Sequence, residues 1–265
     1  MISVADDLVA GPVNRLAALL DHRAPPWPAD RVPPLGHWLF FLPDAPQSAL
    51  GEDGHPADRM APEGAGPRRM WAGGRIDFHA DLPLGARAVR TSVVERVEQK
   101  TGRSGALTFV TLRHEIRVGD TLAVEEWQDI VYRDAPRTSG PASMATPEIR
   151  TAASSRRLQL GPAALFRYSA LTFNAHRIHY DLPYATGVEG YAGLVVHGPL
   201  QATLLVDHLL RIRPEARLAS LQFRGARPLY AGPVRLNLAE EPGGIALWTS
   251  DEAGETCMRA TAVLR

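Results

Sequence analysis

A short segment in the second half of the chain gathers side chains that can move protons. Its members, with two residues that follow an apolar run, are Asn174, His176, His179, Asp181, His197 and Gly198. Histidine titrates near neutrality, so it can take or give a proton at physiological pH. A glycine at an expected helix start offers a backbone N–H to a developing negative charge. This grouping is typical of a site that transfers protons beside a carbonyl.

Each polar residue of this segment also has a structural alternative. Asp181 can cap a short helix or pair with Arg177, four residues earlier. His176 can support a neighbour without reacting, and His197 can fix the loop that it ends. The pattern alone leaves both alternatives open.

The elements around the segment predict a helix enclosed by a sheet. Residues 162–172 read as a helix that starts with proline after glycine, and 179–186 read as a short helix. Residues 199–212 are apolar nearly all round, which is typical of a buried helix. Strands are expected afterwards at 218–223, 234–238, 245–249 and 256–264.

The first half predicts a similar sheet without an equally convincing central helix. Residues 11–21 have helical periodicity, and 43–66 are rich in proline and glycine, so we expect an irregular loop there. Alternating segments at 86–99, 107–117 and 122–133 predict an antiparallel meander.

The expected fold class is therefore α+β: a double hotdog, with antiparallel sheets wrapped around a central helix and a degenerate N-terminal copy. We expect the division 1–135 for the N-terminal hotdog, 136–149 for a linker and 150–265 for the C-terminal hotdog.

Composition excludes several classes of protein. Lys+Arg and Asp+Glu both number 29, so no overall field attracts nucleic acid. The single cysteine, Cys257, excludes an internal disulfide and a multi-cysteine metal site, and we expect it to be buried. No apolar run is long enough for a membrane helix, and the acidic N-terminus lacks the features of a signal peptide. A cytoplasmic location is expected, without a membrane partner.

Residues 169–185, followed by 194–200, resemble the signature of the MaoC-like (R-specific enoyl-CoA hydratase) family. That signature is Ser-Gly-Asp-x-Asn-Pro-x-His-x-Asp, with Ile-x-His-Gly downstream. The variant Phe-Asn-x-His-Arg-Ile-His-Tyr-Asp resembles the branch of hydroxyacyl-thioester dehydratases and mesaconyl-C4-CoA (3-methylfumaryl-CoA) hydratases. Segments of the first half resemble that branch too, and they lie at 33–41, 51–56 (Gly-Glu-Asp-Gly-His-Pro), 67–74 and 100–105.

The resemblance implies a role for each residue of the segment. His179 falls on the family's catalytic histidine, Asp181 on the acid two residues later, and His197 with Gly198 on the His-Gly pair. Asn174 stands where the family usually has a catalytic aspartate. An amide cannot transfer protons in the ordinary way, so Asn174 is expected to orient water or the thioester. The Gly198 N–H is expected to hold the thioester oxygen.

The resemblance implies a hydro-lyase that adds water to, or removes it from, the C2=C3 bond of an acyl thioester such as mesaconyl-C4-CoA. The second half would be catalytic and the first half would shape the acyl channel. Two alternatives stay open: a non-catalytic acyl-CoA-binding module, because of Asn174, and a thioesterase. No metal or prosthetic group is expected, the coenzyme A thioester being substrate, and a homodimer is a candidate assembly. The residues expected to bind substrate are His176, Asp181, His197, Arg69 and Arg224, with Arg68 and Arg227 as further candidates for phosphate or carboxylate groups.

Overall fold

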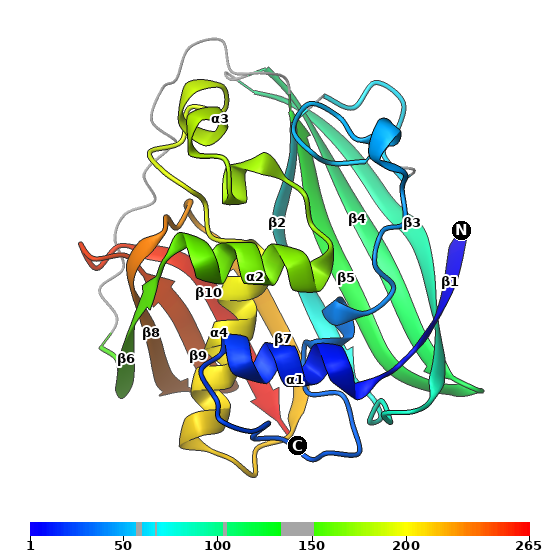
Figure 1. Ribbon diagram of the computed structural model, residues 1–265, viewed down its shortest axis with the longest axis vertical. Helices are drawn as coiled ribbons and strands as arrows, with labels where there is room; N and C mark the ends of the chain where they lie inside the picture. The colour runs from blue at the N-terminus through cyan, green and yellow to red at the C-terminus, as the bar shows by residue number, and fades with distance from the viewer. Residues whose placement is uncertain (57–59, 67, 103–104, 134–150) are drawn as a thin grey trace.

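One antiparallel sheet of ten strands runs through the molecule (Figure 1). The structure is a computed structural model that describes residues 1–56, 60–66, 68–102, 105–133 and 151–265. The strand order is β1-β3-β4-β5-β2-β7-β10-β9-β8-β6. The strands are β1 (Ile2–Asp7), β2 (Arg68–Phe78), β3 (Arg87–Gly102), β4 (Gly105–Val118), β5 (Thr121–Arg133), β6 (Ser154–Leu160), β7 (Leu218–Gly225), β8 (Gly232–Glu241), β9 (Gly244–Ser250) and β10 (Thr256–Leu264).

The two halves of the chain meet at the pairing of β2 with β7. Strands β1 to β5 lie on one side of this seam, and strands β6 to β10 lie on the other. The seam pairs Gly73 with Arg224 and continues to Asp77 and Ser220. The expected linker at 136–149 lies outside the described residues. The expected division into 1–135 and 150–265 therefore stays a prediction.

Helix α4 (Gly198–Ile212) is the central helix of the second half. Every residue from Leu200 to Leu209 is buried, and the helix packs against β8, β9 and β10 (Figure 1). Its buried Asp207 is paired with Arg156 at 3.0 Å, Arg211 at 2.8 Å and His22 at 2.6 Å, so the burial of this carboxylate is compensated. The expected hotdog architecture is confirmed.

The first half lacks such a helix, as the sequence indicated. Its helices among the described residues are α1 (Ala10–Leu19) and the short 3₁₀ helices η1 (Gly36–Leu39) and η2 (Gln47–Ala49). Helix α1 packs on η1 and on α2 (Pro162–Thr172) of the second half. The N-terminal copy of the hotdog is thus degenerate.

The expected short helix at 179–186 is wrong in its bounds. The chain forms a 3₁₀ helix, η3 (Arg177–His179), and then a separate helix, α3 (Leu182–Gly187). The break follows from Asp181, whose carboxylate accepts the Tyr184 N–H at 3.1 Å and so caps α3, with Pro183 in the first turn. The two pieces place His179 and Asp181 on different sides of a bend.

The structure bears on the cysteine and on the membrane expectation drawn from composition. Cys257 is buried, and burial raises the pKa of its thiol to about 12, so it is not a nucleophile at neutral pH. Within the described ranges, no helix has both the length and the apolarity to cross a lipid bilayer.

Candidate active site

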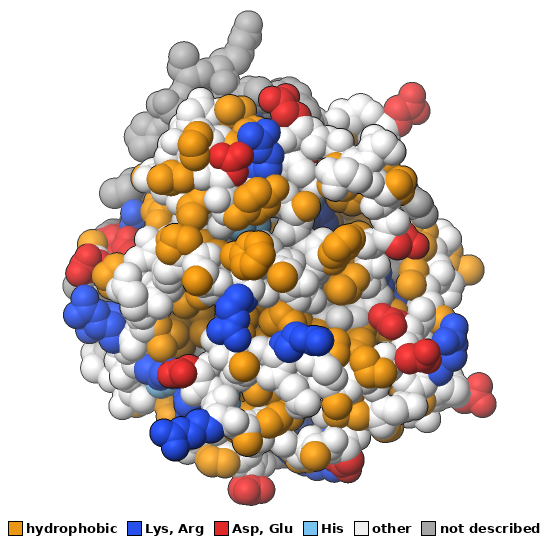
Figure 2. All heavy atoms as spheres, in the orientation of Figure 1, with side chains coloured by type: hydrophobic (Ala, Val, Ile, Leu, Met, Phe, Trp, Pro, Cys, Tyr) orange, Lys and Arg blue, Asp and Glu red, His pale blue; other side chains and the backbone are white. Residues whose placement is uncertain are grey.

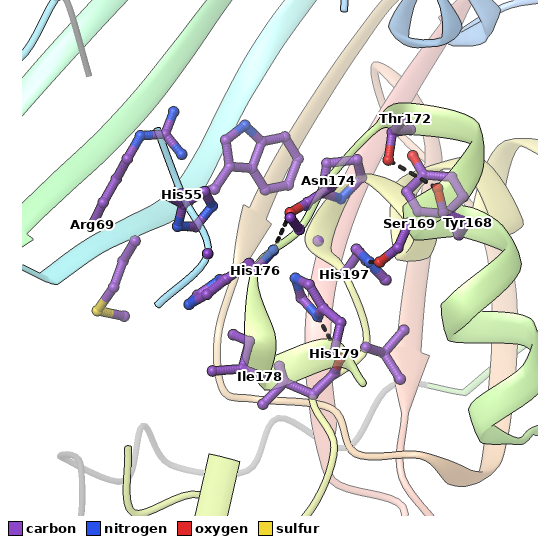
Figure 3. Close-up of a pocket in the computed structure, with 18 of the residues that line it drawn as sticks. His55, Arg69, Tyr168, Ser169, Thr172, Asn174, His176, Ile178, His179 and His197 are labelled. Carbon is purple, nitrogen blue, oxygen red and sulfur yellow. Dashed lines mark hydrogen bonds between the residues drawn. The ribbon is translucent and has the colours of Figure 1, made fainter. Parts of the chain in front are cut away.

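The loop after α2 brings the predicted polar residues to one cavity. Helix α2 ends at Thr172, and the left-handed φ of 48° at the following residue, Phe173, turns the chain sharply. The Asn174 N–H donates to the Ser169 carbonyl at 2.9 Å, and its side-chain Oδ1 accepts the His176 N–H at 2.9 Å. An oxygen must be that acceptor, so the Asn174 amide nitrogen is left as a donor toward the cavity, which Asn174 lines (Figure 3).

The ring of His179 has a defined tautomer. Its Nδ1 lies 2.7 Å from the Val195 carbonyl oxygen, which can only accept, so Nδ1 carries the proton. The neutral ring therefore keeps a lone pair on Nε2. The residue is 6% exposed, and this burial lowers the pKa of His179 to about 4. His179 is thus a neutral base at physiological pH.

His197 lies behind His179 and holds it in place. The two rings stack with centroids 3.5 Å apart and planes 20° apart. The Nε2 atom of His197 lies 2.9 Å from the Ser169 hydroxyl, and burial keeps the pKa of His197 well below its ordinary value. Two uncharged rings can stack at this distance without repulsion. The sequence-based alternative in which His197 fixes the loop agrees with this geometry.

Gly198 is the first residue of α4, directly after His197. Among the described residues, its N–H has no hydrogen-bond acceptor, as expected at a helix N-terminus. The six-membered ring of Trp71 lies where a Cβ of residue 198 would be. Only glycine fits beneath this indole, so Trp71 and the free N–H share one wall of the cavity.

The cavity lies where the two halves meet and has a volume of about 2790 Å³. That exceeds the ~300–1,000 Å³ of an ordinary ligand pocket. Trp38 and Trp71 line it, with ring centroids 6.1 Å apart, and Trp71 stacks on Phe223 at 4.8 Å. The tryptophans serve as both core and cavity wall.

The outer part of the cavity is apolar. Figure 2 shows hydrophobic side chains gathered over the region of α2 and α3. Phe166, Phe173 and Tyr180 are exposed there and line the cavity. This surface suits the acyl or pantetheine part of a thioester better than a small polar ligand.

Of the other residues expected to bind substrate, some line the cavity and some lie outside it. His176 lines the cavity, and burial lowers its pKa to about 2, with His55 and His179 adding to the effect. Arg69 lines the cavity from β2, as does Arg68, which is paired with Glu189 at 3.4 Å.

Two expected binding residues lie outside the cavity. Arg224 is exposed on β7 next to the buried Phe223, and alternation along the strand directs the two side chains to opposite faces of the sheet. Asp181 caps α3 and pairs with Arg177 at 2.8 Å. The geometry of Asp181 agrees with its structural alternative, and neither residue lines the cavity.

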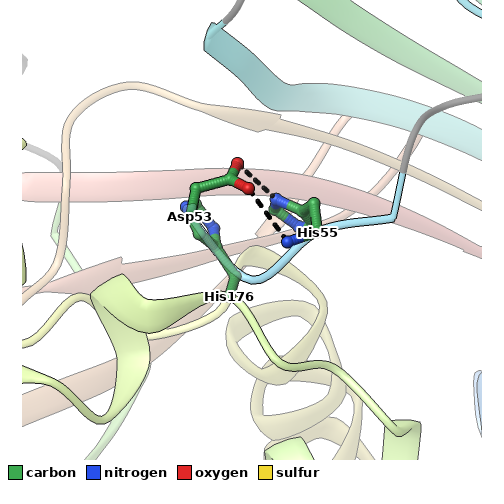
Figure 4. A group of neighbouring side chains, drawn as sticks. All are labelled: Asp53, His55 and His176. Atoms are coloured by element: carbon green, nitrogen blue, oxygen red, sulfur yellow. Dashed lines mark hydrogen bonds and ion pairs between the residues drawn. The ribbon is translucent and has the colours of Figure 1, made fainter. Parts of the chain in front are cut away.

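A second group from the first half lies beside the site, and the sequence analysis assigned it no role. His55 lines the cavity, and its ring centroid is 4.1 Å from that of His176. Asp53 lies behind it, with a carboxylate oxygen 3.1 Å from His55 Nδ1 (Figure 4). Ligand atoms of Asp53, His55 and His176 all lie within 4.8 Å of one another. The only sequence signal was the tight Gly-Glu-Asp-Gly-His-Pro turn at 51–56.

Comparisons with known proteins show the family to which the chain belongs. Residues 35–231 match the family model of hydroxyacyl-thioester dehydratase type 2. The chain is 44% identical to the mesaconyl-C4-CoA hydratase of Chloroflexus aurantiacus, over 98% of this chain and 94% of that protein. It is 27% identical to the mitochondrial hydroxyacyl-thioester dehydratase type 2 of Schizosaccharomyces pombe, over 90% of both.

Solved structures share the fold. HtdX of Mycobacterium tuberculosis superposes with a TM-score of 0.67 at 20% identity, covering 98% of this chain and 99% of that one. A MaoC-like dehydratase from Phytophthora capsici superposes with a TM-score of 0.72 at 13% identity, covering 100% and 96%.

Proposed function

The chain belongs to the hydroxyacyl-thioester dehydratase type 2 family and is a hydro-lyase of acyl thioesters, and from this premise we propose that its substrate is an enoyl-CoA with a C4-dicarboxylic acyl group, such as mesaconyl-C4-CoA. The observation that carries the proposal is the 44% identity to a mesaconyl-C4-CoA hydratase over nearly the whole of both chains. Family membership also sets aside the alternative of a non-catalytic binding module.

His179 is the proposed base. Its free Nε2 lone pair takes a proton from water as the water oxygen attacks C3 of the thioester. Asn174 orients that water through its amide N–H groups, since its oxygen is occupied by the His176 N–H. His179 and Asn174 thus take the place of the histidine and aspartate in the MaoC-like signature.

The Gly198 N–H is the proposed donor to the thioester oxygen. Attack at C3 moves charge onto that oxygen, and the N-terminus of α4 presents an unpaired N–H and the positive end of the helix dipole. The indole of Trp71 covers this position and limits the access of other water molecules.

Arg69 is the proposed partner of the second carboxylate of the acyl group. It lies on the cavity wall formed by β2, and its positive charge is close enough to contribute to the lowered pKa of His176. An arginine fork matches a carboxylate with two hydrogen bonds. This contact would favour a dicarboxylic acyl group over one without a second carboxylate, such as crotonyl.

An absorbance assay at the enoyl-thioester band tests the proposal with crotonyl-, mesaconyl-C4- and long-chain enoyl-CoA. Mesaconyl-C4-CoA should have the highest kcat/KM. Arg69→Gln should lower kcat/KM for mesaconyl-C4-CoA by about tenfold or more, one lost charged contact being worth about 1.5–3 kcal/mol, while crotonyl-CoA is little affected. Arg224→Gln, which alters an arginine outside the cavity, is the matched control. Equal effects of Arg69→Gln on both substrates would exclude the carboxylate contact.

The thioesterase alternative has its own readout. A thioesterase releases the free thiol of coenzyme A, which a thiol reagent detects, whereas hydration leaves the thioester intact. Thiol release matching the loss of absorbance would replace the hydratase proposal.

We propose further that neither a metal ion nor an organic group is required, because the steps above use proton transfer and hydrogen bonds alone. The place to test this is the group Asp53, His55 and His176. Activity should survive dialysis against a chelator and should not rise with added zinc. A cytoplasmic location and a homodimer remain predictions, the second checked by light scattering.

A further inference from the structure

We propose that His55, oriented by Asp53, is the second proton-transfer group of the site and serves the C2 position of the thioester. The inference deepens the proposed function and rests on its hydratase chemistry. Hydration places a hydroxyl on C3 and a hydrogen on C2, so a second group must give a proton to C2. Asn174 stands where the MaoC-like signature has an aspartate, and its amide cannot give that proton.

The loop that carries His55 is closed on itself. Leu50 and Pro56 form a β-bridge, and the Gly51 N–H donates to the His55 carbonyl at 2.7 Å. Asp53 accepts the His55 backbone N–H at 3.0 Å through one carboxylate oxygen and contacts His55 Nδ1 at 3.1 Å through the other. Both the backbone and the ring of His55 are thus held by the same carboxylate (Figure 4).

The same loop is fixed to the loop that carries Asn174 and His176. The Arg177 N–H donates to the Asp53 carbonyl at 2.9 Å, and the Arg177 guanidinium donates to the Glu52 carbonyl at 3.1 Å. Gly54 has a φ of 88°, and a Cβ there would overlap the Ala175 carbonyl oxygen. Two loops distant in the sequence are therefore joined by hydrogen bonds and close packing on one side of the cavity.

Four imidazole rings, those of His55, His176, His179 and His197, follow one another along the cavity wall. Ring centroids are 4.1 Å apart from His55 to His176, 5.4 Å from His176 to His179 and 3.5 Å from His179 to His197. In the proposed mode of binding, the water lies at His179 and the acyl C2 atom is directed toward His55. His55 thus occupies the side of the site opposite His197.

Among these four described histidines, His55 alone has a carboxylate as partner of its ring. Burial opposes the charge of Asp53, but the hydrogen bonds from His55 outweigh it and lower the pKa of Asp53 to about 2, so the carboxylate is ionised. An ionised carboxylate on Nδ1 fixes Nε2 as the exchanging nitrogen and supports the positive charge of a doubly protonated ring.

Three further titratable side chains lie near His55. His176 and His179 face it from the neighbouring loop, and both have pKa values lowered by burial, to about 2 and about 4. Arg69 adds positive charge from β2. At neutral pH, His55 is therefore next to one negative group, one positive group and neutral imidazoles.

The proton balance closes with water as the only reactant added. The water O–H bond breaks, its proton goes to His179 Nε2, and the oxygen bonds to C3. The C2=C3 electron pair moves to the thioester, whose oxygen is held by Gly198. The electron pair then returns from the thioester to C2, which takes the proton from His55 Nε2 as the Nε2–H bond breaks. His55 then regains a proton from solvent and His179 releases one, so both groups return to their starting states.

The test compares His55→Gln and Asp53→Asn with His79→Gln and Glu125→Gln. His79 and Glu125 form a comparable pair at 3.5 Å outside the cavity, so they control for the loss of such a pair. The readout is the pH dependence of kcat/KM, measured with whichever enoyl-CoA the wild type hydrates. His55→Gln should lower kcat by about 10²-fold or more and remove the loss of rate at high pH.

Asp53→Asn should have a smaller effect than His55→Gln and should move the same high-pH loss to lower pH. The double variant should be no worse than His55→Gln alone, because Asp53 acts through His55. Free imidazole should restore part of the activity of His55→Ala but not of Gly54→Ala, in which only the loop is displaced.

Several outcomes would overturn the inference. One is a His55→Gln enzyme that keeps more than about a tenth of wild-type kcat; another is an unchanged high-pH loss. A third is activity that a chelator removes and zinc restores, because His55 and His176 would then be metal ligands. A wild type that prefers crotonyl-CoA to mesaconyl-C4-CoA would contradict only the proposed substrate, since the His55 comparison is made relative to wild type on the same thioester.

Discussion

The histidines of the cavity have identical side chains, but their ring nitrogens contact different groups. A backbone carbonyl fixes the proton of His179 on Nδ1, a serine hydroxyl contacts His197, and a carboxylate contacts His55. The partner decides which nitrogen is free and whether charge is tolerated. Chemical role at this site is therefore set by the partner more than by residue type.

His179→Ala should abolish hydration and leave the fold intact. The ring contributes the free Nε2 that takes the proton from water, and loss of such a group typically costs about 10²–10⁴ in rate. Circular dichroism and an enoyl-CoA absorbance assay would measure the two properties. If His176→Ala were the inactive variant and His179→Ala kept most activity, the assignment of the base would be wrong.

Asn174→Ala should lower kcat strongly, because the water loses its orientation and the His176 N–H loses its acceptor. Asn174→Asp should keep partial or improved activity, because a carboxylate can accept the same N–H and can also take a proton. The pH–rate profile of Asn174→Asp should gain a more acidic limb. An Asn174→Ala enzyme as fast as wild type would show that another group holds the water.

Acid should destabilise the protein through the buried histidines. The folded-state pKa values of His176 and His179, about 2 and about 4, lie below the ordinary value of 6.5. Between these values the unfolded chain binds protons that the folded chain does not, so the free energy of unfolding falls as pH falls from ~6.5 to ~4. Tm measured against pH should show this decline, and His176→Gln should make it shallower while His79→Gln does not.

At the scale of the elements, helices α1, α2 and α4 and most strands were predictable, whereas β1, β2 and β6 and the break between η3 and α3 were not. The apolar periodicity of α4 and the alternation of β3, β4 and β5 come from burial, which leaves a pattern in the sequence. Strands β1 and β6 are the two edges of the sheet and carry charged residues, which obscures the pattern. Strand β2 contains Gly73 and Gly74, which weaken a strand signal.

Apart from Arg69, the residues of the site that were predicted are those that lie close together in the sequence. Asn174, His176, His179, His197 and Gly198 come from one segment and line one cavity, as expected. Asp53 and His55 reach them across the sequence through a turn whose own pattern says nothing about its neighbour. Arg224 was misplaced because alternation on a strand cannot be oriented without knowing which face holds the cavity.

Gly198→Ala should damage both stability and rate, because the new methyl group would overlap the Trp71 indole between β2 and α4. Overpacking of this kind costs about 1–3 kcal/mol, and displacement of the N–H donor about 10²–10³ in rate. Chemical denaturation and kcat would measure these losses. Adding Trp71→Phe should recover part of the stability, and Gly187→Ala, with open space around its Cβ, should be nearly neutral.

At the scale of the whole molecule, the two halves share one sheet and one cavity. The second half contains His179 and Gly198, whereas Trp71, Arg69 and His55 come from the first. Loss of the first half would expose the β7 edge and open the cavity wall.

Residues 150–265 expressed alone should therefore lack hydratase activity and a cooperative thermal transition. Mixing them with 1–135 should recover some of both if the seam can form between separate chains. A cooperative melt with full activity from 150–265 alone would show that the second half is self-sufficient.

The seam between β2 and β7 also has a consequence for biosynthesis. Ribosomes add residues at about 5–20 per second, so β2 emerges well before its partner Leu218–Gly225 has been made. During that interval β2 is an open sheet edge that another nascent chain could capture. Gly73 and Gly74 let β7 approach β2 closely, since a Cβ on Gly73 would overlap the Phe223 backbone. The same glycines that weaken the strand pattern in the sequence therefore allow β7 to close this edge once it has been made.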